Sequence, residues 1–199
     1  MKKLKMFQPA LLLAVLCLTV TLLLAATNEV TRGPIAKQAA EAAYEKKIAI
    51  FPEAASFEPV PLTKDLESAM SGKDISVLEV SQAVDAGGSS LGYVFVTASR
   101  GYAGNVVTTV GIGEGGKVIM VSATAADDTP GLGKRVEEKS FSDQFTGLDT
   151  NVLTGVNGDK NTTKIDAISG ATISSKGASN SVNKAFGAYS YLIEQGVIS

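Results

Sequence analysis

An apolar run near the N-terminus constrains the fold of this chain more than any other feature of the sequence. Three lysines lie among the first five residues, and no charged residue follows from Met6 to Asn28. Because about 20 helical residues span the roughly 30 Å hydrocarbon core of a bilayer, we expect one transmembrane helix over residues 7–27. The lysines favour a cytoplasmic N-terminus over residues 1–6, which places the rest of the chain on the outer face of the cell (inner) membrane.

A cleaved signal peptide is the alternative interpretation of this run. The sequence favours a retained anchor, because the run is long for a signal peptide and Leu24-Ala25-Ala26 is a poor cleavage site. Residues 28–56 are expected to form a helical linker, in which Pro34 stands in the first turn of a new helix that ends before Pro52. Residues 57–199 then form one extracytoplasmic domain.

The absence of histidine excludes much of enzyme chemistry. The chain has no His, and its one cysteine, Cys17, lies in the apolar run. A Ser-His-Asp or Cys-His centre, a Cys-cluster zinc site and an iron–sulfur cluster are therefore excluded within this chain. The net charge of −2 and the lack of a basic cluster beyond the N-terminus argue against nucleic-acid binding. Any redox chemistry must be carried by an organic cofactor.

A first hairpin is predicted in the first half of the domain. Two strand patterns, residues 75–84 and 91–98, flank the turn signal Gly87-Gly88-Ser89-Ser90. Successive side chains of a strand point to opposite faces, so Tyr93 and Phe95 share one face. We interpret this hairpin as part of a core sheet.

A second hairpin is predicted from the β-branched strands at residues 106–110 and 117–121. The connector between them matches G-x-G-x-x-G through Gly111, Gly113 and Gly116. A dinucleotide-binding fingerprint needs a helix after the glycines, whereas here a strand follows. The sequence therefore predicts that these glycines form a turn.

The second half of the domain adds a short helix and a third hairpin. Phe141 and Phe145 are four residues apart, which is typical of a short helix that packs both rings. Asn157-Gly158 predicts a hairpin turn between residues 152–156 and 160–168. Together, the hairpins and flanking helices predict a single α+β domain, preceded by the transmembrane helix.

The last predicted element is a long amphipathic helix from Ser174 to Gln195. Ser174 or Ser175 is expected to cap its start, and Gly196 to end it. An apolar stripe at helical spacing predicts the face that packs on the sheet: Ala178, Val182, Ala185, Phe186, Tyr189 and Leu192.

A loop of turn-forming residues, Asp127 to Gly133, precedes the short helix. The adjacent acidic residues Asp127 and Asp128 have no further ligands beside them, so we predict no metal site there. Pro130-Gly131 and Gly133 specify a tight loop that can bring backbone N–H groups close to a ligand. A plain surface turn is the other interpretation.

A small, hydroxyl-rich stretch, Asp166 to Thr172, leads into the final helix. Its residues are small enough for close approach of a bulky ligand, and Thr172 is expected near the helix N-terminus, where a phosphate is favoured. Three interpretations follow from residue types. The stretch is a plain loop-to-helix junction, it binds a free phosphate or nucleotide, or Thr172 is itself modified.

The sequence Asp166-x-x-Ser169-Gly170-Ala171-Thr172 resembles the flavinylation motif of the FMN-binding domain family. Other motifs occur in the order typical of the G subunit of Rnf electron-transport complexes: Gly101-Tyr102, Thr129 to Gly133, Gln144-Phe145 and the N-terminal anchor. The resemblance covers essentially the whole chain. The C subunit of the Na⁺-translocating NADH:quinone reductase is a relative with the same motif.

The resemblance implies a covalent FMN, linked by a flavin transferase through a phosphoester to Thr172. Ser169, Gly170 and Ala171 would shape the phosphate end of the site, and Asp166 would be recognised by the transferase. Four residues of the preceding loop would lie near the flavin: Thr129, Gly131, Leu132 and Gly133.

The function implied is that of an electron-transfer subunit of an ion-translocating oxidoreductase complex. Such a protein relays electrons between membrane partners and is no catalyst alone. The alternatives are a component like the C subunit of the quinone reductase, another extracytoplasmic flavin carrier, and a membrane-anchored binding or scaffold domain without a redox role.

Overall fold

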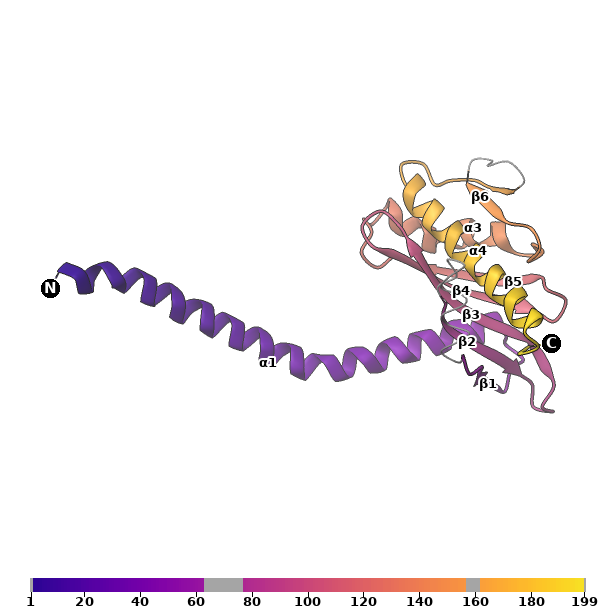
Figure 1. Ribbon diagram of the computed structural model, residues 1–199, viewed down its shortest axis with the longest axis horizontal. Helices are drawn as coiled ribbons and strands as arrows, with labels where there is room; N and C mark the ends of the chain where they lie inside the picture. Colours follow the sequence, from indigo (N-terminus) through magenta and orange to yellow (C-terminus); the bar gives the residue numbers. More distant parts are fainter. Residues whose placement is uncertain (1, 63–76, 157–161, 199) are drawn as a thin grey trace. The chain divides into compact units, whose positions relative to one another are not determined.

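The structure is a computed structural model that describes residues 2–62, 77–156 and 162–198. It divides into two compact units, one up to Glu45 and the other from Lys46 onwards. The second unit combines sheets and helices and confirms the predicted α+β class (Figure 1).

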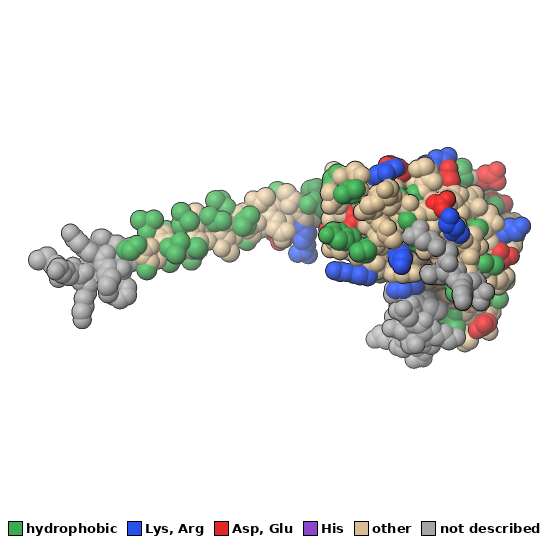
Figure 2. Space-filling model, turned by 90° about the horizontal axis from the view of Figure 1, so that it is seen from above, with side chains coloured by type: hydrophobic (Ala, Val, Ile, Leu, Met, Phe, Trp, Pro, Cys, Tyr) green, Lys and Arg blue, Asp and Glu red, His purple; other side chains and the backbone are tan. Residues whose placement is uncertain are grey.

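The first unit is formed by helix α1 (Lys2–Ile50), whose last turn belongs to the second unit. The part from Pro9 is long and apolar enough to cross a membrane. Between Leu11 and Leu24 the large apolar side chains are all exposed, as Figure 2 shows along the surface of the helix. An exposed apolar surface of this length matches a hydrocarbon environment rather than water.

The expected restart of the helix at Pro34 is wrong, because α1 continues through this proline and ends at Ile50. A proline inside a helix removes one backbone hydrogen bond and crowds the preceding turn. The residues after it are mostly alanine and other strong helix formers, which offset that loss. The predicted end before Pro52 is confirmed.

The second unit is built on a five-stranded antiparallel sheet in the order β1-β2-β3-β4-β5. Its strands are β1 (Ser56–Pro59), β2 (Val77–Val84), β3 (Ser90–Arg100), β4 (Asn105–Gly113) and β5 (Val118–Thr124). The first two predicted hairpins are therefore confirmed, with residues 75 and 76 outside the described part. Because β2, β3, β4 and β5 each pair with the next strand in the chain, short turns are enough to connect them.

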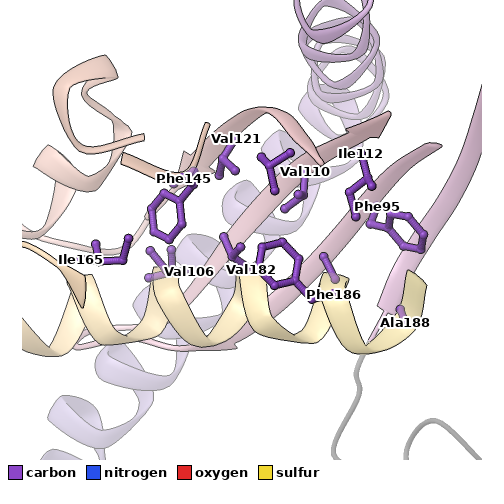
Figure 3. Close-up of a cluster of buried hydrophobic side chains, with 14 of the residues drawn as sticks. Phe95, Val106, Val110, Ile112, Val121, Phe145, Ile165, Val182, Phe186 and Ala188 are labelled. Atoms are coloured by element: carbon purple, nitrogen blue, oxygen red, sulfur yellow. The ribbon is translucent and has the colours of Figure 1, made fainter. Parts of the chain in front are cut away.

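One face of the sheet is covered by α4 (Thr172–Glu194), and the main core lies between them (Figures 1 and 3). Tyr93 and Phe95 of β3 point into this core, and the ring centroids of Phe95 and Tyr189 are 6.1 Å apart in an edge-to-face arrangement. All six residues of the predicted apolar stripe are buried. The side chains that share one face of the helix therefore pack against the side chains that alternate onto one face of the strands.

The opposite face of the sheet holds a smaller cluster around the last turn of α1. Ile50 and Phe51 are buried there with Ala83 and Val94. Gly111 lies opposite Ile50, and a Cβ at Gly111 would overlap the Ile50 Cγ2 methyl. The prediction that this glycine forms part of a turn is therefore wrong, because it lies inside β4 and makes room for Ile50.

A buried lysine adds a polar contact on this second face. The Nζ atom of Lys47 donates hydrogen bonds to Glu79 Oε1 and, at 2.9 Å, to Ser81 Oγ. Burial by itself would raise the pKa of Glu79, but hydrogen bonds from Lys47 and Ser81 and the charge of Lys47 outweigh it and hold this pKa below its ordinary value. The last turn of α1 is therefore joined to β2 by packing and by charge.

A two-stranded sheet lies beside α4 and corrects the third predicted hairpin. Strands β6 (Thr154–Val156) and β7 (Thr163–Ile165) pair in parallel, not antiparallel, and Asn157-Gly158 lies outside the described residues. Contacts to α4 orient β6, since the Asn183 side chain accepts a hydrogen bond from Thr154 N and donates one to Thr154 O. Such tertiary contacts are invisible to a turn motif.

Three short helical segments connect β5 to β6: η1 (Gly133–Glu137), α3 (Lys139–Ser142) and η2 (Asp143–Phe145). As predicted, Phe141 and Phe145 pack their rings together, edge to face, with centroids 5.7 Å apart. These segments lead the chain from the edge of the five-stranded sheet to β6.

Candidate functional site

A cavity of about 450 Å³ lies at the N-terminal end of α4. It is formed by the loop after β5 and by the residues that begin α4, and Tyr102 from the turn between β3 and β4 completes it. Two predicted motifs that are distant in the chain, Thr129 to Gly133 and the stretch that ends at Thr172, thus meet at one site.

The loop after β5 is shaped by a short turn. The backbone N–H groups of Leu132 and Lys134 both point at the Thr129 carbonyl, at 3.2 and 3.3 Å, and Gly131 has a φ of 77°. Glycine takes this left-handed conformation without the steric cost that other residues meet. The turn aims the Leu132 side chain, which is 47 % exposed, along the wall of the cavity.

The stretch before α4 is held by a hydroxyl inside the helix. Ser175 Oγ accepts a hydrogen bond from Ile168 N and donates one to Ala171 O, so the backbone turns sharply through Gly170. The helix begins at Thr172 with Ala171 at the N-cap and without a side-chain cap. The prediction that Ser174 or Ser175 caps the helix is wrong, because both lie within its first turn.

The start of α4 offers free backbone donors to the cavity. The first helical hydrogen bond runs from Ser175 N to Ala171 O, so the N–H groups of Thr172, Ile173 and Ser174 have no acceptor within the helix. Thr172 is exposed at the cavity wall. Free N–H groups and the helix dipole favour an anion at this point.

A buried carboxylate forms another part of the cavity wall. Asp128 is 4 % exposed, and its two oxygens accept hydrogen bonds from Ala103 N at 2.9 Å and from Ser174 Oγ at 2.5 Å. A Cβ at Gly133 would overlap the same carboxylate. Asp128 therefore ties the β3–β4 turn, its own loop and the first turn of α4 together.

Of the predicted cofactor residues, six line this cavity: Thr129, Leu132, Gly133, Gly170, Ala171 and Thr172. Gly131 shapes the loop but does not line the cavity. Ser169 and Asp166 instead line a neighbouring hollow of about 290 Å³. Among the described residues, no group of three or more Asp, Glu, Cys or His is arranged to hold a metal ion.

Asp166 is exposed and held in place through its backbone. The Gln144 side chain accepts a hydrogen bond from Asp166 N at 2.7 Å and donates one to Asp166 O at 3.3 Å. The Asp166 carboxylate lies 2.9 Å from Lys164 Nζ, and this hydrogen bond and charge raise the pKa of Lys164 above its ordinary value.

Sequence reasoning missed four wall residues as site residues: Tyr102, Asp128, Ile173 and Ser174. Ile173 and Ser174 adjoin Thr172 in the chain, so the motif itself could have indicated them. Asp128 adjoins Thr129 but was interpreted only as half of an acidic pair. Its burial depends on contacts with distant segments.

Comparisons with known proteins identify the family. A family model described as FMN-binding domain matches residues 101–187, and one described as RnfG N-terminal region matches residues 1–45. The chain is 33% identical over 194 residues to the G subunit of the Na(+)-translocating ferredoxin:NAD(+) oxidoreductase complex of Acetobacterium woodii. The matched region covers 94% of this chain and 92% of the relative. This chain belongs to the RnfG family.

Two further RnfG relatives show how far the likeness extends. The chain is 37% identical over 103 residues to the G subunit of the Proton-translocating ferredoxin:NAD(+) oxidoreductase complex of Clostridium ljungdahlii, covering 52% of this chain and 56% of the relative. It is 32% identical over 167 residues to the G subunit of the Ion-translocating oxidoreductase complex of Methanosarcina acetivorans, covering 82% and 83%. The resemblance expected from the sequence is confirmed.

Two solved structures resemble part of this RnfG fold. The C subunit of the Na(+)-translocating NADH-quinone reductase from Parabacteroides distasonis is 22% identical, with a TM-score of 0.46 over 62% of each chain. Shewanella oneidensis NqrC is 19% identical, with a TM-score of 0.48 over 73% of this chain and 72% of the other.

Proposed function

We propose that this chain is a membrane-anchored electron-transfer subunit that carries FMN as a phosphoester on Thr172. The observation that carries the proposal is the meeting of the Thr129–Gly133 loop and the Gly170–Thr172 stretch at one cavity beside free helix N–H groups. FMN supplies reversible electron uptake, and the protein positions and tunes it.

The residues present fit the phosphate end of FMN. The Thr172 hydroxyl belongs to the first residue of α4. Gly170, with a φ of 78°, carries no side chain, so a ligand can approach the backbone closely beside Thr172. A phosphoester at this position keeps negative charge beside the helix N-terminus, which is worth roughly 0.3–1 kcal/mol. When the ester forms, the Thr172 oxygen bonds to phosphorus, and the hydroxyl proton and the leaving group of an activated flavin donor depart.

Apolar side chains fit the ring end of FMN. Tyr102, Leu132 and Ile173 line the cavity and are 68 %, 47 % and 54 % exposed. Large apolar side chains exposed together around a cavity are typical of a ligand site. In this arrangement a flavin ring would cover them and keep one edge open for electron exchange.

The partners we propose are those of the family. The relatives are named as subunits of ion-translocating ferredoxin:NAD(+) oxidoreductase complexes. We propose that this chain relays electrons between other membrane subunits of such a complex, and that a flavin transferase attaches the FMN. Asp166, exposed beside the attachment stretch, is the proposed contact for that transferase.

Mass spectrometry tests the attachment. Full-length protein co-expressed with a flavin transferase is expected to carry one FMN on the peptide that contains Thr172, and Thr172→Ala is expected to lose all flavin fluorescence in a denaturing gel. Thr146→Ala is the control, because it removes an exposed hydroxyl outside the cavity and should keep the flavin. An unmodified Thr172 peptide in the wild type would exclude the proposal.

Labelling from outside the cell tests the topology. We propose that residues 1–6 are cytoplasmic and that the FMN domain from residue 57 lies on the outer face. Cys17 is the one cysteine, so Cys17→Ser gives a cysteine-free background. In that background the exposed Thr146→Cys should react with a membrane-impermeant thiol reagent on intact cells or spheroplasts. Protection until the cells are lysed would reverse the proposed orientation.

A further inference from the structure

We infer that Asp128 lowers the reduction potential of the flavin bound at this site. The inference rests on the proposed function, since it needs FMN in the cavity. It concerns a residue that the sequence did not single out for cofactor chemistry.

The hydrogen-bond partners of Asp128 match those of a carboxylate. One oxygen accepts from a backbone N–H, of Ala103, and the other accepts from the Ser174 hydroxyl. A carboxylate only accepts hydrogen bonds, so both of these donors can stabilise its negative charge. The two donors therefore hold an anion in the wall of the cavity.

The surroundings of Asp128 leave this charge without a cation. The residue is 4 % exposed, and in the described part of the chain no ion pair includes it. A group buried to this degree has little contact with water, so its field is screened less than that of a surface carboxylate. The field acts on the cavity, because Asp128 is one of the residues that line it.

A fixed negative charge opposes the reduction of a flavin next to it. Reduction adds two electrons from the donor to FMN and takes up protons from water. If fewer protons than electrons are taken up, the ring gains negative charge. Asp128 makes that added charge less favourable. The free N–H groups at the N-terminal end of α4 act in the opposite sense. They are present both in the wild type and in a variant of Asp128, so the difference between the two reports the carboxylate.

A redox titration of the flavin separates this effect from a structural one. The experiment compares full-length flavinylated protein with its Asp128→Asn variant in detergent at pH 7 and low salt, with dithionite as reductant. Asparagine has nearly the same shape, can accept from Ala103 N and can donate to the Ser174 hydroxyl. Asp127→Asn is the matched control, because it removes the same charge from an exposed neighbour that does not line the cavity.

The expected result is an upward shift of the midpoint potential in Asp128→Asn and none in Asp127→Asn. A tenfold change in the ratio of reduced to oxidised flavin corresponds to about 30 mV for a two-electron couple, and we expect a shift of about this size. An unchanged or lower potential in Asp128→Asn, with flavin present, would overturn the inference.

Two further measurements keep the outcome unambiguous. Mass spectrometry first establishes whether the wild type and each variant carry flavin. A wild type without flavin contradicts the proposed function, whereas the potential of the flavinylated proteins tests the role of Asp128. Ser174→Ala keeps the charge but removes one of its donors, so it should shift the potential downward. If Asp128→Asn does not fold, an upward or absent shift in Ser174→Ala overturns the inference by itself.

Discussion

The two faces of the five-stranded sheet are used in different ways. On one face, α4 buries a large core that includes Phe95, Phe145 and Phe186 and presents its N-terminal end at the cavity. On the other face, the last turn of α1 buries a cluster of four residues and one lysine. The first face stabilises the domain and forms the site, while the second joins the domain to the end of the anchor helix.

This difference predicts on which face of the sheet substitutions lower the stability of the protein most. A large cluster makes the fold depend on each of its aromatic residues, whereas a small cluster depends on close approach and on one charged contact. We therefore expect stability to respond most strongly on the α4 face and the site to respond without large changes of stability.

The largest effect is expected for Phe186→Ala. Loss of a fully buried phenylalanine costs about 3–5 kcal/mol, because transfer free energy and a cavity add together. The measurement is the free energy of unfolding of the full-length protein in detergent by denaturant titration. Phe51→Ala is the comparison on the other face and should cost at least about 1 kcal/mol less. Equal losses would break the distinction between the faces.

A smaller effect is expected for Gly111→Ala. The new methyl group would overlap Ile50, and overpacking of this kind costs about 1–3 kcal/mol. Thermal unfolding measures the loss. Gly115→Ala serves as control, since a Cβ there meets no atom within 4 Å. If both variants unfold at the wild-type temperature, the close approach of Ile50 to β4 is unimportant.

Lys47→Met should destabilise the protein by about 1–2 kcal/mol at pH 7, because it removes a buried hydrogen-bonded charge but keeps the apolar stem. The pKa of Glu79 is lowered in the folded state, so its contribution is present above the ordinary value of 4.5 and is lost as the pH falls through the folded pKa. The difference from the wild type, measured by denaturant titration from pH 7 to pH 3, should therefore shrink below about pH 4.5.

The exposed ion pair Lys37–Glu41, with Lys37 Nζ and Glu41 Oε1 3.9 Å apart, provides the control for the buried charge of Lys47. Lys37→Met should change the free energy of unfolding by less than about 0.5 kcal/mol at any of these pH values. A Lys47→Met variant as stable as Lys37→Met would show that the charged contact on the second face contributes nothing.

The smallest effect on stability, but a clear one on the site, is expected for Gln144→Ala. Its two hydrogen bonds to the Asp166 backbone contribute about 1 kcal/mol together at this exposed position. Loss of that support should lower FMN incorporation several-fold, measured as in-gel flavin fluorescence per protein. Gln195→Ala, beyond the end of α4, should incorporate FMN like the wild type. Full incorporation in Gln144→Ala would show that the stretch keeps its conformation without this side chain.

Patterns of short period were sufficient to predict most of the elements. The apolar run predicted a membrane-competent helix, the alternation around Tyr93 and Phe95 predicted the core face of β3, and the stripe from Ala178 to Leu192 predicted the buried face of α4. Gly196 ends the helix as expected, with a φ of 67°. These features depend on neighbours in the chain, so the sequence alone determines them.

The errors and omissions share a different cause. Gly111 was predicted to form a turn. It lies in β4 instead, and Ile50, which is distant in the chain, occupies the space beside it. Strand β6, which pairs in parallel with β7, is held by Asn183 of α4, and buried Asp128 is held by Ala103 and Ser174. Local patterns in the sequence were enough to predict a helix that can span a membrane, most of the strands and the motif that ends at Thr172. Only the tertiary structure decided that a buried carboxylate lies in the cavity wall, because burial and electrostatic environment arise from contacts between segments far apart in the chain.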